Sequence, residues 1–63
     1  MSPDEEERAQ LVSIEELAEL LRVPVTTVYR WRHTGDAPKG IRVGRHVRFA
    51  MSDVFAWMEE RKS

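Results

Sequence analysis

The fold of this chain is decided by the stretch from Leu20 to Arg32, which reads LLRVPVTTVYRWR. Val28 and Trp31 stand three positions apart, so on a helix they share one side, which we expect to be buried. The opposite side would be polar and basic, and its members are Thr26, Tyr29, Arg30 and His33. The stretch therefore predicts a helix that packs through one side and offers hydrogen-bond donors and positive charge on the other.

A capping box predicts where the preceding helix begins. Ser13 and Glu16 have the spacing at which each side chain bonds the backbone N–H of the other, and Val12 and Leu17 are placed as a hydrophobic staple. The sequence thus predicts a helix over residues 14–21. Its expected buried stripe consists of Ile14, Leu17, Ala18, Leu20 and Leu21.

A proline and a glycine delimit the second helix. Pro24 cannot continue the first helix but suits the first turn of the next, so a helix is expected over residues 24–34. Gly35 is a natural C-terminal stop. Two helices separated by so short a turn follow the plan of a helix-turn-helix.

The next segment alternates apolar and basic residues, which predicts a β-hairpin. Residues 41–43 and 47–49 would form the strands around a three-residue loop at 44–46. This register puts the apolar side chains on one face, with the pairs Val43 with Val47 and Ile41 with Phe49. It also sets Arg42 opposite Arg48, and like charges across a ladder repel unless an anion such as phosphate neutralises them.

A third helix is expected after the hairpin. Ser52 would cap it and Asp53 would stabilise its first turn. Fraying is expected from Glu59 onward. The side chains expected to face the core are Met51, Val54, Phe55, Trp57 and Met58.

Length and composition bound what the chain can do. A domain of 63 residues has no room for a substrate cleft beside its core, so no enzyme activity, cofactor or small-molecule substrate is expected. No apolar run approaches the roughly 20 residues of a membrane span, so no membrane partner is expected. With no Cys, and with His33 and His46 lacking other ligands nearby, no metal site is expected. The absence of Cys and of a basic leader points to a reducing cytoplasm.

The net charge of −1 conceals a segregation of charge along the chain. Residues 1–20 hold seven acidic residues and one basic residue, whereas residues 21–48 hold seven basic residues and one acidic residue. A basic segment of this kind favours a nucleic-acid partner, because the local field matters more than the sum. Residues 1–10 are predicted to be a disordered acidic tail, and residues 11–63 the DNA-binding domain.

Three segments together resemble the excisionase-family, MerR-like winged helix-turn-helix domain. They are LVSIEELAELLRVPVTTVYRW at 11–31, IRVGRHVRF at 41–49 and SDVFAW at 52–57. The resemblance implies a small α+β fold with two helices, a β-hairpin wing and a C-terminal helix. Two positions depart from the family's pattern, since Pro24 stands where such domains often have a capping Ser and Arg22 where they often have Gly.

The resemblance also implies how double-stranded DNA is bound. The second helix would enter the major groove with Thr26 and Arg30 reading bases and Tyr29 against phosphate, while Arg45 at the wing tip would reach the minor groove. Independently, Arg30 can donate two parallel hydrogen bonds to guanine, and a narrow minor groove attracts Arg45. The full set of expected DNA-binding residues is Thr26, Thr27, Tyr29, Arg30, Arg32, His33, Arg42, Arg45, His46 and Arg48.

Three functions remain open. Similar excisionases, or recombination directionality factors, bind attachment-site DNA cooperatively and head to tail, bend it and direct a phage integrase toward excision. The alternatives are a small MerR-like transcription regulator and a module whose basic face meets an acidic protein. Chain length favours the excisionase, because MerR-type regulators usually continue into a long dimerisation helix. The protein is then expected at the nucleoid, as a monomer that self-associates on DNA.

Overall fold

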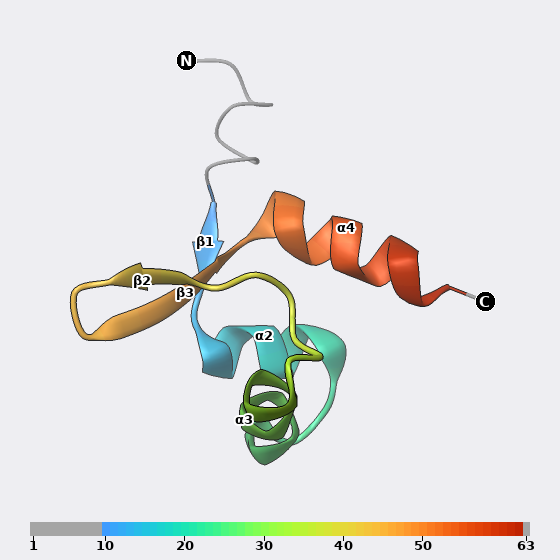
Figure 1. Ribbon diagram of the computed structural model, residues 1–63, viewed down its shortest axis with the longest axis horizontal. Helices are drawn as coiled ribbons and strands as arrows, with labels where there is room; N and C mark the ends of the chain where they lie inside the picture. The colour runs from blue at the N-terminus through green and yellow to red at the C-terminus, as the bar shows by residue number, and fades with distance from the viewer. Residues whose placement is uncertain (1–9, 63) are drawn as a thin grey trace.

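The computed structural model describes residues 10–62, which form three helices and a three-stranded antiparallel sheet. The acidic tail expected over residues 1–10 falls almost wholly outside this range; within it, the carbonyl of Gln10 accepts a hydrogen bond from the backbone N–H of Met51 at 3.0 Å. In chain order the elements are β1 (Leu11–Val12), α2 (Ile14–Leu21), α3 (Val25–Thr34), β2 (Ile41–Val43), β3 (His46–Ala50) and α4 (Met51–Arg61) (Figure 1). The fold is a small α+β winged helix-turn-helix.

Helix α2 has the predicted bounds and the predicted capping box. The Ser13 hydroxyl accepts from the Glu16 N–H at 3.0 Å, and the Ser13 N–H donates to Glu16 Oε1 at 2.9 Å. Leu20 was expected in the buried stripe, and this is wrong, because it is 51% exposed. It lies about 110° around the helix from the buried centre of the stripe, where no described element covers it.

Helix α3 is the second helix of the pair and begins one residue later than expected. Pro24 has a ψ of 146°, so it is the extended residue before the helix rather than part of its first turn. Gly35 ends the helix in the left-handed conformation with a φ of 83°, as predicted. Val28 is fully buried, and Trp31 is half-buried against the same core.

The hairpin has a different register from the predicted one. Its partners are Ile41 with Arg48, Arg42 with Val47, and Val43 with His46. The turn therefore holds two residues, Gly44 and Arg45, instead of three. Gly44 has a φ of 62°, which suits the first position of a type II′ turn. The predicted pairs of Val43 with Val47, Ile41 with Phe49 and Arg42 with Arg48 are all wrong.

The one-residue slip changes which side chains face the core. Phe49 is fully buried, and Val47 on the same face packs against the core. Ile41 and Val43 lie on the outer face, 42% and 47% exposed. The two strand arginines now lie on opposite faces, so the argument that an anion must relieve their repulsion no longer holds.

Helix α4 continues directly from β3. Ala50 is the residue before the helix, and Ser52 lies in its first turn without capping it, so the predicted cap is wrong. The chain turns early because Met51 is already held by the Gln10 carbonyl. Val54 is fully buried, whereas Phe55 is 58% exposed, contrary to expectation, since it lies about 100° further around the helix. The helix extends to Arg61, beyond the expected start of fraying.

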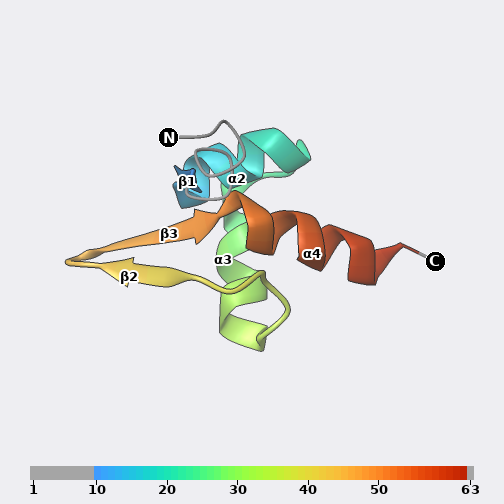
Figure 2. The ribbon, with the colours of Figure 1, turned by 90° about the horizontal axis from the view of Figure 1, so that it is seen from above.

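The core lies where the helices and the sheet meet. Hairpin β2–β3 and α4 extend to opposite sides of this centre, and α3 crosses between them (Figure 2). The buried cluster consists of Val12, Ile14, Leu17, Ala18, Val28, Phe49 and Val54. Helix α3 and the hairpin are thus attached to one small core. No helix among the described residues combines the length and the apolar character needed to cross a membrane.

Candidate nucleic-acid interface

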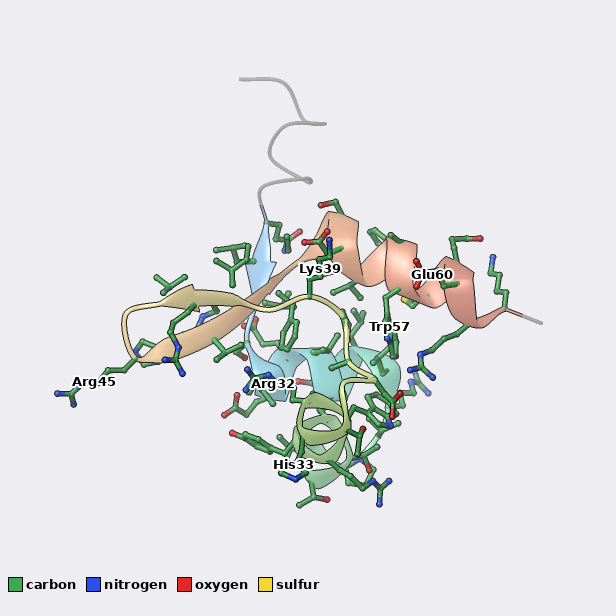
Figure 3. All side chains as sticks on the ribbon, viewed as in Figure 1. Arg32, His33, Lys39, Arg45, Trp57 and Glu60 are labelled. Carbon is green, nitrogen blue, oxygen red and sulfur yellow. The ribbon has the colours of Figure 1, made fainter. Side chains whose placement is uncertain are left out.

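The outer side of α3 carries the polar residues expected there. Thr26, Arg30 and His33 are exposed, and they lie opposite the buried Val28. Figure 3 shows His33 on the side of α3 that faces away from the sheet. Thr27 is half-buried on the flank of the helix. The helix therefore presents donors and cations to solvent over its whole length.

The wing carries its cations at the tip and along both strands. Arg45 occupies the second position of the two-residue turn and extends away from the rest of the molecule (Figure 3). Arg42 and His46 are exposed, whereas Arg48 is half-buried and donates from Nη1 to its neighbour's carbonyl, Val47 O, at 2.9 Å. The tip is therefore free to enter a groove, while Arg48 is held near the base of the wing.

A hollow of about 240 Å³ separates α3 from the wing and gathers half of the predicted residues. Its walls come from α3, from the wing and from the first turn of α2. The lining residues are Ile14, Glu15, Tyr29, Arg32, Arg45, His46, Val47 and Arg48. The fold thus brings together Tyr29, Arg32, Arg45, His46 and Arg48. Thr26, Thr27, Arg30, His33 and Arg42 lie outside this hollow.

Among residues 10–62, no carboxylate pairs with the charges of this surface. Within residues 10–62 the only ion pair joins Lys62 to Glu59 at 3.0 Å, on α4 and its end. The guanidinium groups of α3 and the wing therefore have no carboxylate within 4 Å in the described part of the chain. Glu15 is the single acidic residue that lines the hollow. Such a surface attracts an anion, and binding the anion relieves the repulsion among its positive charges.

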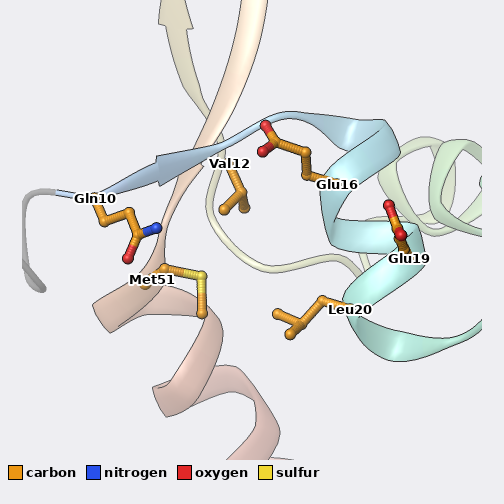
Figure 4. A pocket seen from close by; sticks show the side chains of 6 residues that line it. All are labelled: Gln10, Val12, Glu16, Glu19, Leu20 and Met51. Carbon is orange, nitrogen blue, oxygen red and sulfur yellow. The ribbon is translucent and has the colours of Figure 1, made fainter.

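A larger hollow, of about 360 Å³, has the opposite character (Figure 4). It lies between β1, α2 and the start of α4, and its lining residues are Gln10, Val12, Glu16, Glu19, Leu20 and Met51. Two carboxylates and no cation line it, so it would repel a phosphate. Size alone does not identify the nucleic-acid site here; the sign of the charge does.

The pKa of Glu16 is lowered from its usual value of 4.5. The main cause is the hydrogen bond from the Ser13 backbone N–H, followed by the bond with the Ser13 hydroxyl; the positive charge of Arg48 adds a smaller effect. The base of the wing is therefore electrostatically linked to the start of α2.

A cluster at the far end of α3 has a role that the sequence did not suggest. Trp57 Nε1 and Arg61 Nη2 both donate to the carbonyl of Asp36, at 2.7 and 2.6 Å. Asp36 and Arg61 were given no role, although the four-residue spacing of Trp57 and Arg61 is one at which a helix stacks a guanidinium on a ring. Trp31 is half-buried against the core, as expected; Trp57 is also half-buried but packs against Trp31 rather than against the buried cluster, so its expected place in the core is wrong.

No group of three or more potential ligand side chains is placed to hold a metal ion in the part of the chain that the structure describes. The functional residues of the surface are hydrogen-bond donors and cations. Their chemistry is that of binding an anion with base edges beside it, as a DNA duplex presents.

Comparison with known proteins agrees with this geometry. The sequence profile of a family described as "Helix-turn-helix domain" matches residues 11–62. Two curated relatives from Mycobacterium tuberculosis are 40% identical over 52 residues, "Putative DNA-binding protein MT0521" of strain CDC 1551 and "Putative DNA-binding protein Rv0500A" of strain H37Rv. The match covers 82% of this chain and 65% of each relative, so the chain spans just under two thirds of their length.

Proposed function

We propose that this chain, which belongs to the helix-turn-helix domain family, binds double-stranded DNA in a sequence-specific manner. The observation that carries the proposal is the basic surface shared by α3 and the wing, whose guanidinium groups have no carboxylate partner within residues 10–62 and which places five of the expected residues around one hollow. The relatives' names, which speak of DNA binding, support it.

In this proposal α3 lies in the major groove, whose width admits one α-helix. Arg30 reads a guanine through two parallel hydrogen bonds, and Thr26 offers a hydroxyl to a base edge or a methyl to thymine. Both side chains are exposed on the outer side of α3, which is the side that a duplex would meet. Thr27 and His33 would contact the backbone or the edges of the site.

The wing supplies the part of the affinity that does not depend on sequence. Arg45 reaches the minor groove from the tip, and narrow A·T-rich segments would attract it most strongly. Tyr29, His46 and the guanidinium groups around the hollow would contact phosphates that pass between helix and wing. These guanidinium groups belong to Arg32 and Arg48, with that of Arg42 on the exposed strand β2.

For the biological role we propose an excisionase, a recombination directionality factor acting at the bacterial nucleoid. Its support is the resemblance of the three sequence segments to the excisionase family. One copy reads few base pairs, so copies bound head to tail would gain occupancy from the shared duplex, bend it and favour excision by a phage integrase. The alternative is a small MerR-like transcription regulator, for which the same DNA-binding surface serves equally.

The arrangement of binding sites separates these roles. Duplexes would first be selected from a random-sequence library by the wild-type chain, and the selected sequence then located in genomic DNA and footprinted. Tandem sites filled cooperatively, with bending in a gel-shift series of one, two and three sites, support the excisionase. Inverted pairs filled by a dimer that exists without DNA support the regulator. No preference for any sequence would overturn the proposed function itself.

A further inference from the structure

We infer that Trp57 and Arg61 of α4 are positioning residues for DNA recognition, which fix α3 and the wing relative to each other without touching DNA. This inference rests on the proposed function, because it concerns the accuracy with which α3 meets base edges. The two side chains come from the last turns of α4, which extends away from the wing (Figure 2). Both bond to Asp36, in the connection that joins α3 to β2, and Figure 3 shows Trp57 reaching from α4 toward this connection.

We call the contacts that Trp57 and Arg61 make with Trp31 and with the connection to β2 the clamp. Its first element is the backbone carbonyl of Asp36. It accepts two hydrogen bonds from α4, from Trp57 Nε1 at 2.7 Å and from Arg61 Nη2 at 2.6 Å. The Asp36 N–H donates in turn to Trp31 O on α3 at 2.8 Å. Asp36 thus bonds to the end of α3 through its N–H and to α4 through its carbonyl.

The second element is the packing of aromatic rings. The Trp31 and Trp57 centroids lie 5.5 Å apart with their planes inclined by 49°, an ordinary geometry for an aromatic pair. The Arg61 guanidinium lies 4.5 Å from the Trp57 centroid and 6.0 Å from that of Trp31. Because Trp31 lies between Arg30 and Arg32 in the sequence, holding its ring restricts rotation of α3 about its own axis.

The third element is the connection itself. Pro38 is buried, and residues 37–39 lie along α4, where they and α4 line a hollow of about 220 Å³. The connection leads directly into β2, so α4 restrains the start of the wing as well as the end of α3. A recognition group must be held within about 0.5 Å and 10–20° of its productive position, which a rigid connection provides and a loose one does not.

A phosphate contact by Arg61 is the rival explanation of any loss of binding, and salt dependence distinguishes the two. Replacing a cation that contacts a phosphate by a neutral residue lowers the slope of log affinity against log salt by about one, whereas replacing a positioning residue leaves the slope unchanged. Two variants probe the clamp: Arg61→Met removes the donor and the charge, and Trp57→Phe removes the N–H and keeps a ring. Lys62→Met is the matched control, since the Lys62 ammonium bonds only to the Glu59 carboxylate among the described residues.

The test titrates wild-type and variant chains with a duplex selected by the wild type from a random library, and with a scrambled duplex of the same composition, over a range of salt. Both clamp variants should bind the selected duplex about tenfold more weakly, which is the cost of one lost base contact, and the scrambled duplex unchanged. Their salt slopes should equal that of the wild type, and the amides at the end of α3 should exchange hydrogen faster. Lys62→Met should change none of these.

Other outcomes overturn the inference. A reduced salt slope with equal loss on both duplexes would make Arg61 a phosphate contact, and unchanged binding by Trp57→Phe and Arg61→Met would remove the clamp. If Arg61→Met fails to fold, Trp57→Phe decides alone. A wild-type chain that prefers no duplex would instead defeat the proposed function, while hydrogen exchange would still report whether the clamp holds α3.

Discussion

Ser13 and Glu16 exchange two hydrogen bonds, of 2.9 and 3.0 Å, across the first turn of α2. The carboxylate is the acceptor in one of them, so the bond is strongest when Glu16 is ionised. The pKa of Glu16 is accordingly lowered, first by the Ser13 backbone bond and to a lesser degree by the charge of Arg48. The stability of the first turn of α2 therefore depends on pH.

A group whose folded pKa is lowered contributes stability above its unfolded pKa and loses it as the pH falls through the folded value. We expect Glu16→Gln to destabilise the fold at pH 7, and we expect this difference from the wild type to disappear as the pH falls below 4.5 and through the lowered pKa of Glu16. Urea unfolding of the variant and the wild type, at pH 7 and at a pH well below 4.5, measures the difference in stability. Glu19→Gln is the control, since Glu19 lies on the same helix outside the capping box. A difference that stays constant with pH would contradict the assignment.

Removing the one acidic residue of the hollow should strengthen DNA binding. Glu15 lines the same hollow as three arginines, where it would repel a phosphate. Glu15→Gln should raise affinity about two- to fivefold at low salt, the size of one exposed charge interaction, and less at high salt. Titration of a scrambled duplex checks this, with Glu19→Gln as the matched loss of charge outside the hollow. Equal gains for the two variants would show a general charge effect only.

Arg22 is expected to limit stability. It has a left-handed backbone with a φ of 58°, the only non-glycine residue with a positive φ between residues 10 and 62. A side chain in that region costs roughly 1–2 kcal/mol. Glycine avoids this cost, but part of the gain is lost because glycine is more flexible in the unfolded chain. Arg22→Gly should therefore stabilise the fold by about 0.5–1 kcal/mol in urea unfolding. Arg22→Ala keeps the strain and should not; a gain of the same size from Ala would refute this explanation.

Replacing Phe49, in the core, should destabilise the fold more than replacing Trp31, which packs against the core. Phe49 is fully buried, so Phe49→Ala should cost about 3–5 kcal/mol, comparable to the whole stability of so small a domain. Trp31 is half-buried and rests partly on Trp57, so Trp31→Ala should cost less, about 2–3 kcal/mol. Urea unfolding measures both. If Trp31→Ala unfolds at the same urea concentration as the wild type, the ring of Trp31 is not held by α4.

Local rules predicted the helices well because their signals lie within a few residues. The capping box at Ser13 and the stop at Gly35 each depend on one turn of backbone, and both are confirmed. The start of α4 was misplaced because Met51 is held by Gln10, which is distant in sequence. No local signal at Ser52 reports that contact.

The wing and the clamp were beyond local rules for two different reasons. The alternation of apolar and basic residues in the hairpin fits a two-residue turn as well as a three-residue turn, and the choice moves every side chain of β2 to the other face relative to β3. The bond from Trp57 to Asp36 spans 21 positions, and only the packed fold brings the two together. The individual DNA-binding residues remain predictions, because their test needs the DNA.

Titration of Arg30→Ala and Arg45→Ala separates the proposed reading of bases by α3 from the proposed binding of the DNA backbone by the wing. Each variant would be measured against a selected and a scrambled duplex over a range of salt. Arg30→Ala should cost about 1–3 kcal/mol on the selected duplex and relax the preference at one base pair, with little effect on the scrambled one. Arg45→Ala should weaken both duplexes alike and lower the salt slope by about one. Equal loss on both duplexes for Arg30→Ala would contradict the account.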